Sequence, residues 1–255
     1  MIEPIVDILM YHSISNRGGP TAIPQSVFAE QMAALAWAEV PVISLDDYLA
    51  AREGEATLQP HSVIITFDDG FQDFADAAWP VMAKHGFRPM VYLPTAYVGR
   101  AEGWRGIADP PRALMGWATI RSLAREGVEF GSHTVNHPEL DALRDAPLEA
   151  ELVRSRAEIE ERIDRAVRHF APPYGIARPD VRARIAETYH SSAGTRLARA
   201  RLSGDPFDLP RIEMHYFSDL RRWRAHLAGR GAAYLAARQA LRAARGMLVK
   251  PWRGA

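Results

Sequence analysis

The sequence predicts a single α/β domain built around a parallel sheet. Three observations lead to this prediction: short apolar runs alternate with helical segments, polar clusters directly follow two of these runs, and no Gly/Ser-rich linker or internal repeat divides the chain. The 255 residues, 47% hydrophobic and 24% charged, have the composition of a folded globular protein. Such a sheet is either open or closed into a barrel, and in both forms catalytic groups gather at the carboxyl ends of the strands.

Five apolar runs have the length and composition of buried strands. They are Ile5–Met10, Val63–Phe67, Pro89–Leu93, Val128–Phe130 and Val167–Phe170, with weaker candidates at Val40–Ile43, Ser191–Gly194 and Ile212–Phe217. Helical segments with start or stop signals lie between them. They are a helix that opens at Ser26, Phe71–His85, Ala118–Glu126, Pro147–Ala166, and Asp180–Tyr189 after Pro179. The irregular segment Tyr97–Met115 is the expected active-site loop.

Charge is balanced over the whole chain but not along it. The 31 basic and 31 acidic residues cancel, so no global charge attracts nucleic acid, and we expect no nucleic-acid partner. Residues 219–255 hold nine basic side chains and one acid, a net charge of +8, whereas residues 1–218 carry −8. We call residues 219–255 the basic segment and treat it as a helical extension of the domain formed by residues 1–218.

Two interpretations of the basic segment stay open. It is either a pair of solvated helices, broken near Gly229–Gly231, that pack on an acidic body, or an amphipathic surface that attracts an anionic membrane or a phosphate-bearing substrate. The start of the chain, MIEPIVDILMYHSI, lacks the features of a signal peptide, and no apolar run reaches the ~18 residues of a membrane span. We therefore expect a cytoplasmic protein that the basic segment can hold at the inner membrane surface. No oligomeric state is predicted.

Two polar clusters have the residue types of a metal site, and the absence of cysteine excludes thiolate ligands and a cysteine nucleophile. TFDDG (residues 66–70) places two adjacent carboxylates after an apolar strand, a costly arrangement unless a cation lies between them. SHTVNHP (residues 132–138) places two histidines four apart after another strand. Each cluster alone also has a plain structural interpretation, as a helix N-cap with a spare acid or a chance histidine pair. Together, Asp69, His133 and His137 predict a two-His-one-carboxylate metal site, with Asp68 beside it as general base.

These two motifs, followed by FAPPYG at residues 170–175, resemble the polysaccharide deacetylase family, also called the NodB-homology or carbohydrate esterase family 4 domain. The resemblance covers roughly residues 5–217. It implies a distorted (β/α)7 barrel whose mononuclear metal site removes N-acetyl groups from the hexosamines of a glycan. It further implies that Asp68 is the base, that Zn²⁺ or another divalent ion (Co²⁺, Ni²⁺ or Mn²⁺) binds to Asp69, His133 and His137, and that the Tyr174 N–H binds the oxyanion.

Two departures from the family pattern lead to further assignments. The arginine that commonly begins the third motif and orients the base is replaced here by Ala171. We predict that Arg211 takes its place beside Asp68, because the planar guanidinium can hold a carboxylate at two points while staying charged. A plain surface role for Arg211 at a strand start stays open.

The second departure concerns the general acid. The family's late Leu-x-His motif has no clean match near the C-terminus. Instead, Leu9-Met10-Tyr11-His12 ends the first strand, and this resembles some biofilm-polysaccharide deacetylases, in which a circularly permuted barrel moves the acid histidine to the N-terminus. His12 is therefore the preferred general acid and His215 the alternative. For both, an ordinary polar role at a strand end stays open.

The resulting prediction is a hydrolase that deacetylates N-acetylhexosamine units of a bacterial exopolysaccharide, of the biofilm or holdfast type, or of its lipid-linked precursor. Two other classes stay open: an amidohydrolase acting on a small cyclic amide or imide, and an inactive glycan-binding homologue. The intact set of Asp69, His133 and His137 disfavours the first class, and the presence of both acids and both histidines disfavours the second.

Overall fold

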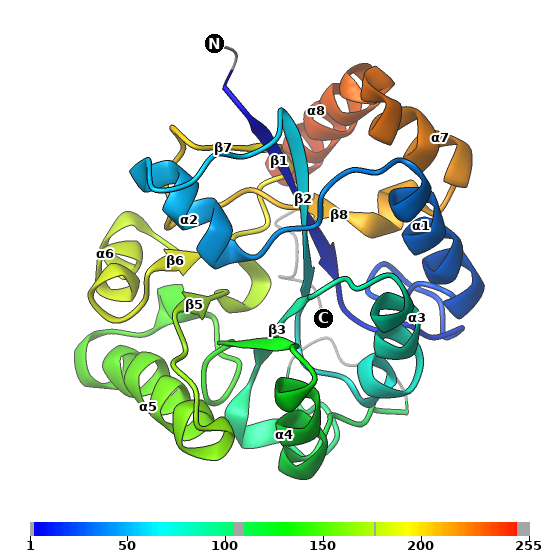
Figure 1. The fold of residues 1–255 in the computed structure, drawn as a ribbon. Coiled ribbons are helices and arrows are strands. Elements are labelled where there is room, and N and C mark those ends of the chain that lie inside the picture. The colour runs from blue at the N-terminus through cyan, green and yellow to red at the C-terminus, as the bar shows by residue number, and fades with distance from the viewer. Residues whose placement is uncertain (1–2, 105–109, 176, 249–255) are drawn as a thin grey trace.

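Seven parallel strands curl into a barrel with the helices on its outside, within the residues that this computed structural model describes, 3–104, 110–175 and 177–248 (Figure 1). The strands are β1 (Ile5–Tyr11), β2 (His61–Phe67), β3 (Met90–Leu93), β4 (Glu129–Ser132), β5 (His169–Phe170), β6 (Ser191–Ser192), β7 (Ala200–Arg201) and β8 (Ile212–Glu213). The helices are α1 (Gln25–Trp37), α2 (Leu45–Glu53), α3 (Trp79–Lys84), α4 (Trp117–Arg125), α5 (Asp145–Ile163), α6 (Pro179–Thr188), α7 (Leu220–Ala225) and α8 (Ala232–Leu248). Short helical turns are η1 (Phe74–Ala78), η2 (Thr95–Tyr97), η3 (Leu140–Ala142), η4 (Pro173–Gly175), η5 (Met214–Phe217) and η6 (His226–Arg230).

The order of the strands closes the sheet on itself. Neighbouring strands run β6-β5-β4-β3-β2-β1, and β8 pairs in parallel with the carboxyl half of β1, while β7 pairs antiparallel with its amino half. The remaining gap, between β6 and β8, is spanned by a parallel bridge from Ala193 to Leu209. The Gly194 N–H donates to the Leu209 carbonyl over 2.9 Å there. The predicted distorted (β/α)7 barrel is therefore confirmed.

Alternating side chains separate two apolar layers. On β1, Val6 and Ile8 point into the barrel, whereas Leu9 and Tyr11 point outward against the helices. On β2, Ile64 points inward and Val63, Ile65 and Phe67 point outward. Both faces are apolar over Val63–Ile65 of β2, which explains why this stretch is a continuous hydrophobic run instead of an alternating one.

The predicted elements differ from the observed ones mainly at their ends. The helix expected over Phe71–His85 is present from Gln72 to Lys84, with the π-helical turn η1 ahead of α3. The candidate strand Ile212–Phe217 keeps strand geometry only at β8 before turning into η5. The prediction missed α2 altogether. Its signals are present in the sequence, because Ser44 and Asp47 form a capping box at its start and Gly54 ends it in the left-handed conformation.

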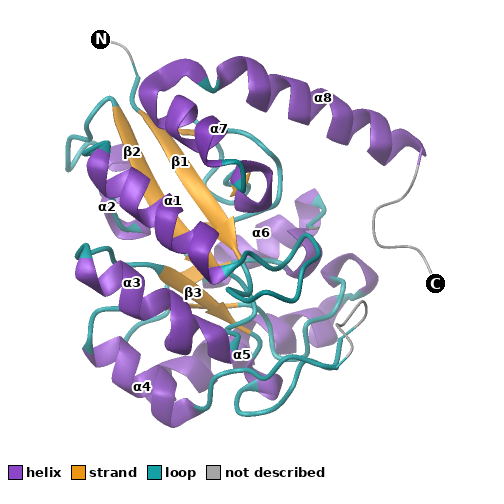
Figure 2. Ribbon diagram, turned by 90° about the vertical axis from the view of Figure 1, so that its right-hand side faces the viewer, coloured by secondary structure: helices purple, strands orange, loops and turns teal. Residues whose placement is uncertain are grey.

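Over its described part, residues 219–248, the basic segment is helical, and its helices break at Gly229, which has a φ of 78°. Trp223 and His226, from α7 and η6, are buried against the body, and the Trp223 indole N–H donates to the Gln31 carbonyl on α1. From Gln239 to Ala244 the side chains of α8 are exposed, and Figure 2 shows this helix extending beyond the barrel. In the described residues no helix combines the length and the apolar character needed to cross a membrane.

One buried carboxylate fastens the basic segment to the barrel. Asp7 on β1 is fully buried and accepts hydrogen bonds from His61 over 2.7 Å, from His226 over 2.8 Å and from Arg199 over 2.7 and 3.0 Å. Burial acts to raise the pKa of Asp7, but the hydrogen bonds from His226, His61 and Arg199 outweigh it and hold the pKa far below its usual value. Asp7 therefore remains ionised and connects β1 to β2, to the segment before β7 and to η6.

We expect Asp7→Asn to lower the free energy of unfolding at pH 7 by about 3–5 kcal/mol, because it leaves buried donors and cations without their acceptor. A carboxylate with a lowered folded-state pKa stabilises the fold above its unfolded pKa of about 3.9 and loses that effect as the pH falls further. The difference between the wild type and the variant should therefore shrink below about pH 4. Urea denaturation at several pH values measures it, with the exposed Asp76→Asn as the control. A difference that does not depend on pH would contradict the assignment.

Candidate active site

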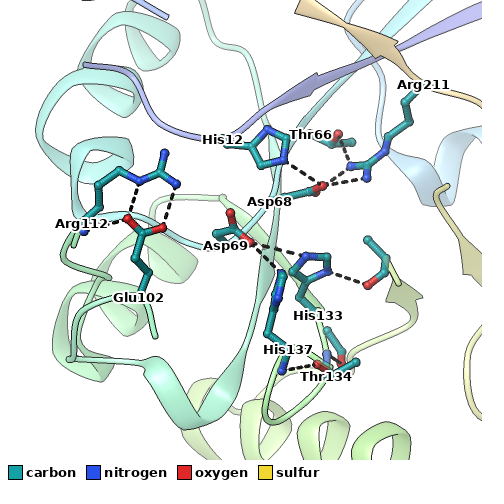
Figure 3. A network of polar contacts seen from close by, with 12 residues as sticks. His12, Thr66, Asp68, Asp69, Glu102, Arg112, His133, Thr134, His137 and Arg211 are labelled. Atoms are coloured by element: carbon teal, nitrogen blue, oxygen red, sulfur yellow. Dashed lines mark hydrogen bonds and ion pairs between the residues drawn. The ribbon is translucent and has the colours of Figure 1, made fainter. Parts of the chain in front are cut away.

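The candidate site lies at the carboxyl ends of the parallel strands, where alternation directs polar side chains into the barrel (Figure 3). On β1 the inward positions end with Met10 and then His12, one residue past the strand. On β2 they end with Thr66 and then Asp68. The inward alternation of side chains on β1 and β2 therefore continues past the strands and places His12 and Asp68 in the same cavity.

Asp68 and Arg211 form a buried, two-point ion pair. Arg211 Nη1 and Nη2 donate to Asp68 Oδ1 and Oδ2 over 2.6 and 2.7 Å, and both residues are almost inaccessible to solvent. Arg211 is itself held by the Gly194 carbonyl over 2.8 Å and by Thr66 Oγ1 over 3.2 Å. Burial acts to raise the pKa of Asp68, but the charge and hydrogen bonds of Arg211 outweigh it and lower this pKa. The pairing predicted from the sequence is present, and it keeps Asp68 ionised.

Asp69, His133 and His137 converge on one point. Asp69 Oδ1 lies 3.5 Å from His133 Nε2 and 3.3 Å from His137 Nε2, and the three potential ligand atoms all lie within 4.8 Å of one another. All three residues are buried. Two ligands at about 2.1 Å from a tetrahedral ion are about 3.4 Å apart, which is close to the observed spacing.

The protonation of His133 also suits a metal ligand. Its Nδ1 donates to the Ala171 carbonyl over 2.6 Å, which leaves the lone pair of Nε2 directed at Asp69 and His137. Burial, together with the nearby His137, lowers the pKa of His133 to about 4, so its ring is neutral near pH 7. A neutral imidazole held by its other nitrogen is the form that binds metal ions. These three residues therefore fit a divalent ion.

Strained backbone is concentrated at this site. Among the described residues, seven other than glycine have a positive φ, and four of them, Asp69, Thr134, His137 and Tyr174, lie around the cavity at 72°, 71°, 55° and 61°. Such conformations cost of order 1–3 kcal/mol each and persist where the surroundings enforce them. At Asp69 the turn continues into Gly70, where a side chain would meet Leu93 Cδ2 at 2.5 Å. The turn after β2 thus separates the directions of two adjacent carboxylates.

Glu151, which the sequence analysis did not single out, holds the loop between the two histidines. From α5 its Oε2 accepts the backbone N–H groups of Val135 and Asn136 over 2.8 and 2.9 Å, and its Oε1 accepts from the Asn136 side chain. Thr134 Oγ1 accepts the His137 N–H over 2.9 Å. No local pattern marks Glu151, because it lies on an ordinary amphipathic helix and acts only through tertiary contact.

His12 lies beside the Asp68–Arg211 pair, with its Nε2 3.8 Å from Asp68 Oδ2. The turn after it is fixed by Asp73, which accepts from Ser13 Oγ over 2.5 Å and from the Ile14 N–H over 3.0 Å. Tyr174 also lines the cavity, and its ring meets that of His137 edge-on at 5.0 Å. His12 and Tyr174 are thus both placed on the cavity that holds Asp68 and the three potential metal ligands.

His215 is not brought to this cavity. The strand β8 ends at Glu213, and the chain turns into η5, which buries Met214 and Phe217 and leaves His215 exposed. The alternative general acid is therefore corrected: of the two histidines, only His12 faces Asp68.

The expected loop Tyr97–Met115 forms one wall of the cavity, although residues 105–109 lie outside the described part. A buried ion pair ties its two arms together, since Arg112 Nε and Nη2 donate to the two oxygens of Glu102 over 2.8 Å. Trp104 stacks on His137 with ring centres 4.4 Å apart. The cavity between this wall and the strand ends has a volume of about 130 Å³.

We expect Glu151→Gln to weaken metal binding about 10–100-fold, because an amide cannot accept both backbone N–H groups and the Asn136 side chain with the strength of a carboxylate. Calorimetric titration of the metal-free protein with Zn²⁺ measures the change. The control is Glu149→Gln, an exposed acid on the same helix. Equal affinities of the two variants would show that the histidine loop does not depend on Glu151.

Comparison with known proteins agrees with this geometry. The polysaccharide deacetylase family model matches residues 55–191, about half of the chain. The chain is 30% identical over 167 residues to a chitooligosaccharide deacetylase of Sinorhizobium fredii, a match that covers 65% of this chain and 67% of that protein. It is 27% identical over 157 residues to protein YxkH of Bacillus subtilis, covering 58% of this chain but only 49% of YxkH.

Among solved structures, IcaB from Ammonifex degensii has the same fold, with a TM-score of 0.73 at 23% identity, over 89% of this chain and 97% of that one. The family match contains Asp68, Asp69, His133 and His137, whereas His12 and Arg211 lie outside it. Since the match spans more than half of the chain and the barrel and its polar strand ends agree with it, the chain belongs to the polysaccharide deacetylase family, hydrolases of N-acetyl amide bonds.

Proposed function

We propose that this protein is a metal-dependent N-deacetylase that acts on N-acetylhexosamine units of a bacterial exopolysaccharide or of its lipid-linked precursor. One observation carries the proposal: the adjacent residues Asp68 and Asp69 face different partners in one cavity, a buried arginine and a pair of histidines. Metal-assisted hydrolysis of an amide uses a proton acceptor and a Lewis acid, and this dipeptide supplies the acceptor and one ligand for the Lewis acid.

Zn²⁺ is the proposed ion, with Co²⁺, Ni²⁺ and Mn²⁺ as alternatives that the same nitrogen and oxygen donors accept. Bound by Asp69, His133 and His137, it would polarise the acetyl carbonyl and bring the pKa of a water molecule towards ~7. The chain's own contribution is to keep His133 neutral and to enforce the backbone turn that aims Asp69 at both rings.

The remaining groups divide the proton transfers between them. Asp68, kept ionised and oriented by Arg211, accepts the proton of the attacking water as the new C–O bond forms. His12 donates a proton to the nitrogen as the C–N bond breaks, because an amide nitrogen leaves poorly as an anion. The backbone N–H of Tyr174 is the proposed donor to the oxyanion. The products are acetate and a hexosamine with a free amino group, and a proton passed from Asp68 to His12 restores the starting state.

The substrate class is supported by two observations. The Sinorhizobium relative is named for chitooligosaccharides, which are N-acetylhexosamine oligomers. His12, which follows β1, is the feature by which the sequence resembles some biofilm-polysaccharide deacetylases. A cyclic amide or imide hydrolase and an inactive glycan-binding homologue are the alternatives that the following experiment separates.

The metal-loaded protein should release acetate from chitin oligomers, and Asp69→Ala should lose both the bound metal and this activity. Metal analysis combined with an acetate assay measures both quantities. Hydrolysis of a cyclic imide in place of the oligomers would identify the amidohydrolase alternative. Metal binding with no turnover of either substrate would identify the inactive homologue. Wild-type activity of Asp69→Ala without metal would refute the metal site.

Two variants in the same assay separate chemistry from metal binding. Asp68→Asn should retain the metal but lower kcat about 10²–10⁴-fold, the usual contribution of a general base. Arg211→Ala should also retain it and lose turnover, whereas Arg211→Lys should recover only part, because an ammonium cannot hold both oxygens of Asp68. Loss of metal from Asp68→Asn would mean that Asp68 is itself a ligand.

We also propose that the protein is cytoplasmic and that the basic segment holds it at an anionic membrane surface, near a lipid-linked substrate. Support comes from its charge of +8 and from the exposure of Arg221, Arg224 and Arg230. Each basic side chain near an anionic bilayer contributes about 1 kcal/mol of attraction, which falls off within the ~8 Å Debye length of physiological salt.

The full chain should therefore sediment with phosphatidylglycerol vesicles but not with phosphatidylcholine vesicles, and less as salt rises. Replacing Arg221, Arg224 and Arg230 by glutamine should reduce binding about 10²-fold at low salt. The matched control replaces Lys84, Arg121 and Arg125, which are exposed outside the basic segment, by glutamine. Equal losses in the two triple variants would contradict a role for the basic segment.

A further inference from the structure

One wall of the cavity is built by parts of the chain that the family match does not include. Glu213, at the end of β8, and Arg242, on α8, line the cavity together with His12 and Asp68. The family match ends at residue 191, so Glu213 and Arg242 both lie in the part of the chain that follows the match. Figure 2 shows α8 running past the barrel in the direction of the loops at the carboxyl ends of the strands.

Glu213 follows Arg211 on the same face of the chain. Residues two apart on an extended strand point the same way, so Arg211 and Glu213 both face inward, while Ile212 between them packs outward in the core. Arg211 reaches Asp68, and Glu213 lies one step further along the barrel axis. Met10 on β1 is the register partner of Glu213, and His12 lies two residues further along the same inward face and lines the same cavity. Glu213 therefore lies on the side of the cavity where the leaving amine would be.

The Glu213 carboxylate lacks a side-chain donor. Within the described residues, no side chain forms a hydrogen bond or a close ion pair with it; the backbone N–H of His215 and the charges of His12, Arg242 and Arg211 act on it instead. Burial raises its pKa, and the three charges partly oppose this effect. A partly buried carboxylate that faces an open cavity with unused acceptor sites can accept hydrogen bonds from a bound ligand.

We propose that Glu213 is a substrate-binding residue that accepts a hydrogen bond from the hexosamine on the leaving-amine side of the scissile bond. The donor is a sugar hydroxyl, or the ammonium of a neighbouring unit that is already deacetylated. Arg242 on α8 supplies a positive charge that opposes the effect of burial on Glu213. This inference rests on the proposed deacetylase function.

We expect Glu213→Ala to raise KM for chitin oligomers about tenfold with kcat within about twofold, the size of one hydrogen bond to a charged group. Glu161→Ala, an exposed acid on α5 outside the cavity, is the control and should leave both parameters unchanged. Glu213→Gln separates the two donors. It should behave nearly as the wild type if the donor is a hydroxyl, and as Glu213→Ala towards partly deacetylated oligomers if the donor is an ammonium.

Two results would overturn the inference. One is an unchanged KM of Glu213→Ala on both fully and partly acetylated oligomers. The other is a fall in kcat with a shifted pH profile and an unchanged KM, which would show that Glu213 acts on His12 and not on the sugar.

A measurement of oligosaccharide binding tests this inference independently of the proposed deacetylase activity. If the wild type releases no acetate, calorimetry compares chitopentaose binding by Asp68→Asn with binding by Asp68→Asn/Glu213→Ala. Weaker binding by the double variant would support the sugar contact even though the proposed reaction had failed. Equal binding, or no binding by either protein, would overturn it.

Discussion

The buried ion pair between Asp68 and Arg211 is the constraint on which the rest of the site depends. A carboxylate buried this deeply next to a second one would take up a proton without a cation beside it, and a protonated acid cannot serve as a base. Arg211 meets this need only because β8 closes the barrel next to β1, so that its guanidinium arrives opposite the end of β2. The barrel must therefore close at β8 for Asp68 to stay ionised.

The same pair explains how one dipeptide provides two functions. Asp68 continues the inward alternation of β2 and meets the arginine, whereas Asp69 has left the strand and adopts a left-handed backbone that turns its carboxylate toward the histidines. Without the change in backbone direction, strand alternation would point Asp69 out of the barrel, away from the two histidines. The energetic cost of the turn is confined to these residues. Gly70, which follows it, is packed so tightly against Leu93 that a side chain there would collide with it.

Much of this architecture is predictable from the sequence because it follows local rules. Runs such as Val63–Phe67 identify strands, and the carboxyl ends of parallel strands identify the place of Asp68, Asp69, His133 and His137. The pairing of Arg211 with Asp68 followed from the chemical need of a base that had lost its usual partner.

What the sequence does not reveal depends on tertiary contact. Glu151 and Asp7 lie on ordinary helix and strand positions, and only the packing of distant elements turns them into anchors. His215 has the right residue type, but the helical turn after β8 directs it to solvent, and no short-range pattern specifies that turn. The short strand β7 went unpredicted for the same reason, since two residues acquire strand geometry only by pairing with β1.

The connectivity of the barrel also sets an order of events during synthesis. The three potential metal ligands all lie between residues 69 and 137, whereas the cation that Asp68 requires is supplied 143 residues after it. Pairings this distant in sequence form late, because loop closure must precede any gain from the contact. A nascent chain therefore contains its three potential metal ligands well before Arg211, the partner of Asp68, leaves the ribosome.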